Sequence, residues 1–186
     1  MEMDKLEIDN ILKIYELTSE FEHERASSIH GRLRWMVKED KSLEPIREHL
    51  KNLILQYEEK YWSNEDTITD DQIKESDIAE KIIYSENLFI QKRKELIRKK
   101  LKQSGLSQKD LAKILGHRPN YMSELINGVR PFSKDDLVVI HRLFEIDFKD
   151  LLPPFLKSDV RNHIRTTLGE LKNKKVKIKL KDFEIA

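Results

Sequence analysis

Histidine, serine and acidic side chains are the groups in this chain that can do acid–base, nucleophilic or metal chemistry. The chain has 186 residues, of which six are histidine and none is cysteine. Without cysteine, disulfides, thiolate zinc sites and cysteine nucleophiles are excluded. His23 and His30 are seven residues apart with no third ligand nearby, and no histidine pair has zinc-protease spacing. No nucleophile elbow or phosphate loop occurs, so we predict no enzyme, no catalytic or metal-binding residues and no cofactor.

Charged residues are unevenly distributed along the chain. Lys and Arg number 35 and Asp and Glu 34, which gives a net charge of +1. Residues 1–90 carry −10, so residues 91–186 carry +11. The positive excess is concentrated in residues 92–102 and 172–181. An acidic half and a basic half suggest two parts with different partners, and the basic half is the candidate for nucleic acid.

Composition predicts the fold class. Charged residues make up 37% of the chain and hydrophobic residues 38%, with only 5 Gly and 5 Pro for turns. This mixture favours a mainly all-α protein and disfavours an all-β fold with many hairpins. No run of about eighteen apolar residues and no secretory leader occurs, so we expect a cytoplasmic protein with no membrane partner.

Apolar periodicity and capping residues predict the helices of the acidic half. One or two helices are expected over residues 4–38, and another from an N-cap at Ser42 through residue 61. After a polar loop at 63–68, Thr69 has capping-box spacing to Gln72 and is expected to start a further helix. Ser85 is interpreted as another cap, followed by a basic helix that ends near Gly105.

Residues 92–152 contain the most informative pattern. After the basic helix, Ser107 can cap a short helix that Gly116 ends, and Pro119 then starts a second short helix that Asn127-Gly128 ends. Two short helices joined by a tight turn are the geometry of a helix-turn-helix. The residues expected to pack them are Leu111, Ala112, Leu115, Met122 and Leu125.

This segment resembles the phage-repressor-like (Cro/C1, XRE) helix-turn-helix family over about sixty residues. The likeness rests on Leu106-Ser107-Gln108, Leu111-Ala112, Gly116, Asn127-Gly128, Phe132-Ser133 and the stretch from Leu137 to Leu152. Many relatives have a charged pair where this chain has Leu101 and Ile126; both partners are apolar here, so no charge is left unpaired. The resemblance implies a C-terminal five-helix, lambda-repressor-like domain.

The resemblance also implies roles for individual side chains. The second helix of the motif would lie in the major groove of operator DNA, with Arg118, Pro119, Asn120 and Glu124 at the base edges. Arg118 can pair with guanine, Asn120 with adenine, and Glu124 can accept a hydrogen bond from cytosine. Phosphate contacts are expected from Gln108, Tyr121, Ser123, Arg130 and Lys134. The alternative for each is a solvated surface residue.

The whole chain is expected to have three parts. These are an acidic helical dimerisation or partner-binding domain at 1–88, the helix-turn-helix domain at 89–155, and an extension at 156–186. The extension is expected to contain a helix from Ser158 and an amphipathic, basic β-strand around residues 174–181. That strand is interpreted as a lysine-protected sheet edge or as a basic arm for DNA or a partner protein.

The order of an acidic helical part before a helix-turn-helix resembles HigA-type antitoxins, and residues 55–62 are similar to the end of an acidic helix there. This resemblance implies a nucleoid-associated, homodimeric autorepressor that also neutralises a ribonuclease toxin in a type II toxin–antitoxin system. A free-standing XRE-type repressor is the alternative. Because Pro119 and Glu124 lie in the reading helix, a protein-interaction module with a degenerate helix-turn-helix is another.

Overall fold

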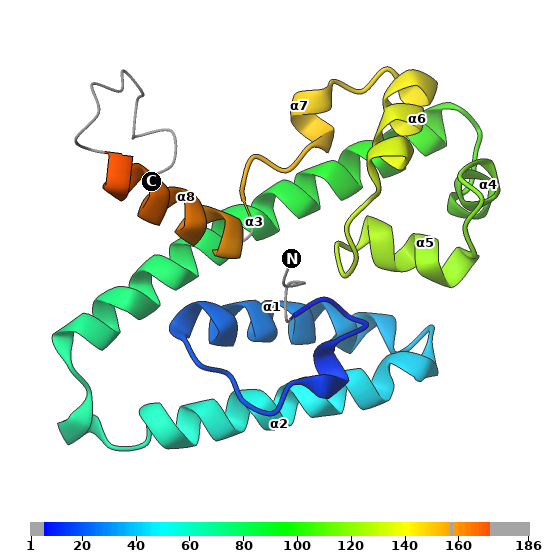
Figure 1. The fold of residues 1–186 in the computed structure, drawn as a ribbon. Coiled ribbons are helices and arrows are strands. Elements are labelled where there is room, and N and C mark those ends of the chain that lie inside the picture. The colour runs from blue at the N-terminus through cyan, green and yellow to red at the C-terminus, as the bar shows by residue number, and fades with distance from the viewer. Residues whose placement is uncertain (1–5, 157, 172–186) are drawn as a thin grey trace.

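The computed structural model describes residues 6–156 and 158–171, and in these ranges the chain is helical with no β-strand (Figure 1). This confirms the predicted mainly all-α fold. The predicted strand near residues 174–181 lies outside the described residues. In the described part of the chain, no helix is both long and apolar enough to cross a membrane.

Eight α-helices follow one another in the described ranges. They are α1 (Glu20–Met36), α2 (Glu44–Tyr61), α3 (Asp70–Gln103), α4 (Gln108–Ile114), α5 (Pro119–Ile126), α6 (Lys134–Phe144), α7 (Phe148–Leu151) and α8 (Ser158–Glu170). Short 3-10 turns at Ile11–Lys13, Lys41–Leu43 and Glu65–Thr67 precede α1, α2 and α3. The predicted helix from Ser158 is therefore present.

The N-terminal part consists of α1 and α2, which run antiparallel, and the segment before α1, which covers them (Figure 1). Its apolar core includes Ile11, Leu17, Leu33 and Leu50. The expectation of helix throughout residues 4–38 was wrong, because α1 begins only after Ser19, whose hydroxyl accepts a hydrogen bond from Glu22 N. Ile11 and its apolar neighbours belong to a segment that folds back over the helices and is buried there. Their spacing resembles that of a helix face although the segment is not an α-helix.

Helix α2 begins one residue later than predicted, because Leu43 stands at the N-cap position instead of Ser42. Ser42 does not cap it: the Asp40 carboxylate accepts hydrogen bonds from Ser42 N and Oγ and so holds Ser42 inside the 3-10 turn. Helix α2 then starts at Glu44, with Pro45 in its first turn as predicted.

Helix α3 is one continuous helix from Asp70 to Gln103. Thr69 caps it as predicted, because its hydroxyl accepts a hydrogen bond from Gln72 N at 3.2 Å. The predicted cap at Ser85 was wrong: the Ser85 hydroxyl donates to the Lys81 carbonyl within the helix. Residues 70–103 contain neither Gly nor Pro, so nothing breaks the helix there. The expected domain boundary near residue 88 thus lies inside α3.

The C-terminal half of α3 and helices α4–α7 surround a second apolar core, and together these described helices make the predicted five-helix domain. Its members include Ile97, Leu111, Met122 and Leu125. Leu101 and Ile126, the apolar residues at the positions of the familiar charged pair, are both buried in this core. After α7, Phe155 packs edge-on against Phe89 of α3, with ring centroids 5.6 Å apart.

Candidate nucleic-acid interface

The α4–α5 unit is fixed by caps at its ends. The Ser107 hydroxyl accepts from Asp110 N at 3.2 Å, and Ser107 N donates to Asp110 Oδ2 at 2.9 Å, which completes a capping box. Gly116, with φ of 73°, ends the first helix in the left-handed region that glycine favours. Pro119 lies in the first turn of α5, as its fixed φ favours.

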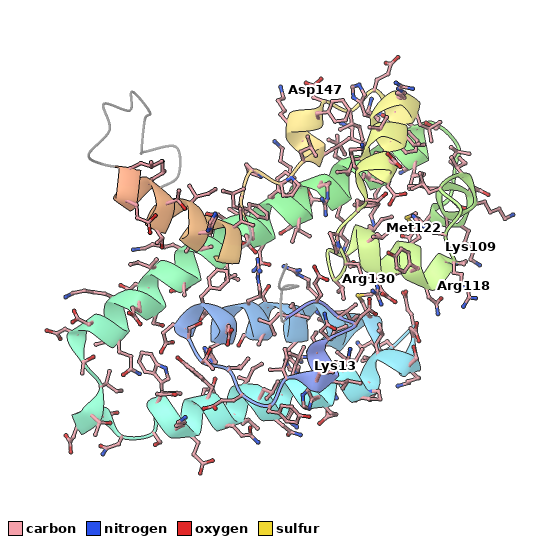
Figure 2. All side chains as sticks on the ribbon, viewed as in Figure 1. Lys13, Lys109, Arg118, Met122, Arg130 and Asp147 are labelled. Carbon is pink, nitrogen blue, oxygen red and sulfur yellow. The ribbon has the colours of Figure 1, made fainter. Side chains whose placement is uncertain are left out.

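Helix α5 presents one face to the core and its N-terminal end to the surface. Met122, Leu125 and Ile126 are buried against the second core. Arg118, Pro119 and Asn120, three of the four predicted base-reading residues, are exposed together at the start of the helix. Figure 2 shows Arg118 at this end of α5. Arg118 has no hydrogen-bond or ion-pair partner among the described residues.

Glu124 is separated from these three residues by burial. Only 8% of its surface is exposed, and its carboxylate accepts a hydrogen bond from Arg130 Nε. The turn at Gly128 folds the chain back so that Arg130, six residues later, reaches the preceding helix. Sequence spacing within α5 could not reveal this pairing, since it depends on the turn that follows.

Arg130 joins the helix-turn-helix to the N-terminal segment. Its guanidinium donates to both carboxylate oxygens of Asp9, with Nη2 to Oδ1 at 2.7 Å, and lies over the Tyr121 ring at 5.2 Å. The hydrogen bond to Asp9 raises the pKa of Arg130, and the same bond lowers the pKa of Asp9. Figure 2 shows Arg130 between α5 and this segment. A predicted phosphate contact is thus occupied by a carboxylate.

Asn120 makes the second contact with the acidic half. Its side-chain amide donates to Asp40 Oδ2 at 2.8 Å, from α5 to the connection between α1 and α2. The hydroxyl of Ser42, more than Asn120 itself, lowers the pKa of Asp40 and keeps it charged. Asp9 and Asp40 lie 121 and 80 residues from their partners, so periodicity and capping patterns had no means of revealing either contact.

The other predicted phosphate contacts surround this end of the domain. Lys134 is exposed at the start of α6, and Gln108 is partly buried at the start of α4. Tyr121 is exposed and packs beside His117, with ring centroids 5.0 Å apart. Ser123 is partly buried, and its carbonyl and hydroxyl accept hydrogen bonds from the Asn127 amide.

Two further side chains near the motif, those of His117 and Lys94, link it to neighbouring helices. His117 Nε2 lies 2.9 Å from Asp136 Oδ1, which links the α4–α5 turn to α6. Lys94 of α3 donates to Asn127 Oδ1 at 2.7 Å and so ties the end of α5 to α3. Within the described ranges, no group of three or more His, Asp or Glu side chains is arranged to hold a metal ion.

Comparison with known proteins identifies one segment of the chain. Residues 97–151 match the family model described as helix-turn-helix. The match begins in the C-terminal half of α3 and ends with α7, so it covers the second apolar core. No curated protein and no solved structure matches the chain.

Proposed function

Because residues 97–151 form a helix-turn-helix domain of the XRE, Cro/C1 type, a family of DNA-binding regulators, we propose that this protein is a sequence-specific transcriptional repressor. The observation that supports this most directly is the exposed cluster at the start of α5. There Arg118 and Asn120, side chains suited to guanine and adenine, stand on the second helix of the motif.

In the proposed complex, the N-terminal end of α5 enters the major groove. Arg118 and Asn120 read bases, and Pro119 contributes shape and contact. Gln108, Tyr121, Ser123, Arg130 and Lys134 bind phosphates on either side of the groove. Glu124 takes part in base reading only after Arg130 releases it, so its role is coupled to the rearrangement of Arg130 on a phosphate.

The described arrangement has the contacts of a DNA-free state. Asp40 occupies the hydrogen-bonding amide of Asn120, and Asp9 occupies the guanidinium of Arg130. Phosphates repel both carboxylates, so operator binding displaces the N-terminal part from α5. We propose that the protein binds its operator as a homodimer, because one small domain reads too few base pairs to be selective.

A mobility-shift titration with the DNA upstream of the chain's own gene, at two salt concentrations, tests the repressor. Arg118→Ala and Asn120→Ala are each expected to cost about 1–3 kcal/mol of binding free energy. They are also expected to remove the preference for that DNA over a scrambled duplex. Lys134→Ala is expected to weaken both duplexes alike. Lys81→Ala, an exposed change on the first half of α3, is the control.

The dependence of binding on salt completes this test. Binding is expected to weaken steeply at the higher salt, since each phosphate contact releases counterions. Absence of any shift at low salt would sink the repressor proposal and favour an interaction module.

A second candidate function is that of an antitoxin, supported by the charge of −10 over residues 1–90. An acidic domain suits a basic, RNA-cutting toxin through steering and through masking of its RNA site. The test is co-expression with the product of the neighbouring gene. An antitoxin is expected to co-purify with it and restore growth, whereas growth that stays arrested without a complex leaves the free-standing repressor.

A further inference from the structure

A cavity of about 230 Å³ lies where the N-terminal part meets the helix-turn-helix domain. Its walls come from α1, from the middle of α3, from the turn after α5 and from the segment after α7. In Figure 1 these elements converge near the centre of the molecule. None of the described residues that line the cavity belongs to α5, so it is separate from the exposed side chains proposed to read bases.

Arg93 of α3 is a buried cation in the cavity wall. Only 5% of its surface is exposed, and its guanidinium lies over the rings of Phe89 and Phe132 at 5.4 and 5.1 Å. Its Nη1 donates a long hydrogen bond of 3.3 Å to the Leu151 carbonyl. Its Nε is buried and has no hydrogen-bond partner among the described residues. An unpaired donor on a buried cation is costly unless a ligand satisfies it.

Arg32 of α1 adds a second cation to the same cavity. It donates to the Gly128 carbonyl at 2.6 Å, to the Ser28 hydroxyl at 3.1 Å and to the Asn87 amide oxygen, all of which are neutral acceptors. Burial lowers the pKa of both Arg32 and Arg93 to about 10, and at Arg93 the charge of Arg32 contributes to this lowering. Both side chains nevertheless remain charged at neutral pH.

The carboxylates nearest to these cations are committed elsewhere. Glu86 accepts hydrogen bonds from Arg25 at both oxygens, at 3.0 and 2.8 Å. Arg130, also in the wall, is bound by Glu124 and Asp9. Among the described residues, neither Arg32 nor Arg93 has a hydrogen bond to a carboxylate. Glu86 and Arg25 offset each other, and Glu7 is a further carboxylate in the wall, so the two charges of Arg32 and Arg93 exceed it by one and the site favours a ligand with a single negative charge.

The rest of the wall is mostly apolar. It includes Ile29, Ile83, Val129, Phe132 and Phe155. A strongly hydrated dianion such as phosphate gains nothing from these side chains and loses its water, whereas a hydrocarbon body is stabilised by them. A dry cavity of about 150 Å³ accommodates benzene, so this one has room for roughly ten non-hydrogen atoms.

We propose that this cavity binds a small monocarboxylate with an apolar body, whose carboxylate accepts hydrogen bonds from Arg93 and is balanced by the charge of Arg32. The planar guanidinium suits a carboxylate in two-point geometry. The aromatic rings over Arg93 and the aliphatic side chains enclose the body of the ligand. The site does not depend on DNA binding, so it stands or fails independently of the repressor proposal.

Calorimetric titration of the full chain with octanoate and 3-phenylpropanoate tests the proposal. The uncharged controls are octanamide and 3-phenylpropanamide, which have nearly the same shapes. Saturable binding of at least one carboxylate is expected, with its amide at least about tenfold weaker because only the anion compensates the buried cation. Inorganic phosphate is expected to compete weakly or not at all.

Variants locate the binding. Arg93→Met removes the charge while keeping an apolar side chain of similar length, and is expected to weaken carboxylate binding at least about tenfold with amide binding unchanged. Arg98→Met, the same change at an exposed position on α3, is expected to bind like the wild type. Arg32→Gln serves as a second variant should Arg93→Met fail to fold.

Four results would overturn the proposal, and the first three concern the binding of the carboxylates and amides. They are absence of saturable binding for both carboxylates, equal binding of carboxylate and amide by the wild type, and unchanged carboxylate affinity in well-folded Arg93→Met. Competition by phosphate as strong as that by octanoate would indicate a simple anion site and would also contradict it.

Discussion

Arg130 pairs with carboxylates from both parts of the chain. Its guanidinium is held by Glu124 from its own domain and by Asp9 from the N-terminal segment, beside the ring of Tyr121. Asp9 and Asp40 together place two carboxylates on side chains proposed to bind DNA. In the proposed complex, the acidic half would therefore compete with DNA for the same donors.

Asp9→Asn is expected to increase operator affinity. The substitution removes a negative charge that DNA repels and frees Arg130 for phosphate, which we expect to tighten binding about three- to tenfold at low salt. A fluorescence-anisotropy titration measures this. Asp77→Asn changes the charge equally at an exposed position of α3 and is the control. Equal effects of the two substitutions would assign the gain to net charge alone.

His30 is expected to make folding stability depend on pH. Its Nε2 is buried without a partner in the described structure, and burial, followed by the charge of Arg47, lowers its pKa from 6.5. The unfolded chain therefore binds the proton more readily, and the free energy of unfolding falls as the pH drops below about 6.5. His30→Gln is expected to flatten this dependence in urea titrations between pH 7 and 5. An unchanged slope would exclude His30 as its source.

Among the secondary-structure elements, the helices of the helix-turn-helix were the most predictable. Ser107, Gly116, Pro119 and Gly128 act through local backbone chemistry, so the ends of α4 and α5 could be found from neighbouring residues alone. Ser85 failed as a cap because a serine starts a helix only where the chain is not already helical.

The same distinction applies to the candidate site. The sequence was sufficient to expect Arg118 and Asn120 at the start of a reading helix, and the structure puts both on the surface there. The contacts of Asn120 and Arg130 with Asp40 and Asp9, and the burial of Arg93, arise from packing between distant segments. Residue patterns carry no signal for such contacts.

Gly128 and Gly116 offer a matched pair of turns for a stability test. Both have φ near 70°, but a Cβ at Gly128 would lie 2.5 Å from Ile90 Cγ2, while one at Gly116 meets no described atom within 4 Å. Gly116→Ala is expected to cost about 1 kcal/mol from backbone strain, and Gly128→Ala about 2–3 kcal/mol because Ile90 must also move. Urea unfolding measures both, and equal losses would contradict the role of Ile90.

On the scale of the whole molecule, α3 and the contacts beside it join the two parts. Val129, from the turn after α5, packs in the apolar core of the N-terminal part, and Arg32 of α1 donates to the Gly128 carbonyl. The three-part division stays a prediction, and α3 runs through its first boundary without a break.

The two parts are expected to unfold together. Leu33→Ala removes a fully buried side chain from the N-terminal core and is expected to cost about 2–5 kcal/mol. Hydrogen exchange followed by mass spectrometry should then show faster exchange in α6, far from the substitution, by a factor similar to that in α2. Exchange that accelerates only in α1 and α2 would show that the parts open independently.

The continuity of α3 also has a mechanical consequence. A helix of 34 residues is about 50 Å long; this one is linked to α1 through Glu86 and Asn87 near its middle and packs in the second apolar core through Ile97 and Leu101 toward its C-terminal end. The middle of α3 forms a wall of the cavity around Arg93. A tilt of α3 by about 5° about its middle displaces each end of the helix by roughly 2 Å. This is comparable to the shifts by which packed helices move in regulated proteins. A small change at the cavity wall can therefore move both ends of α3.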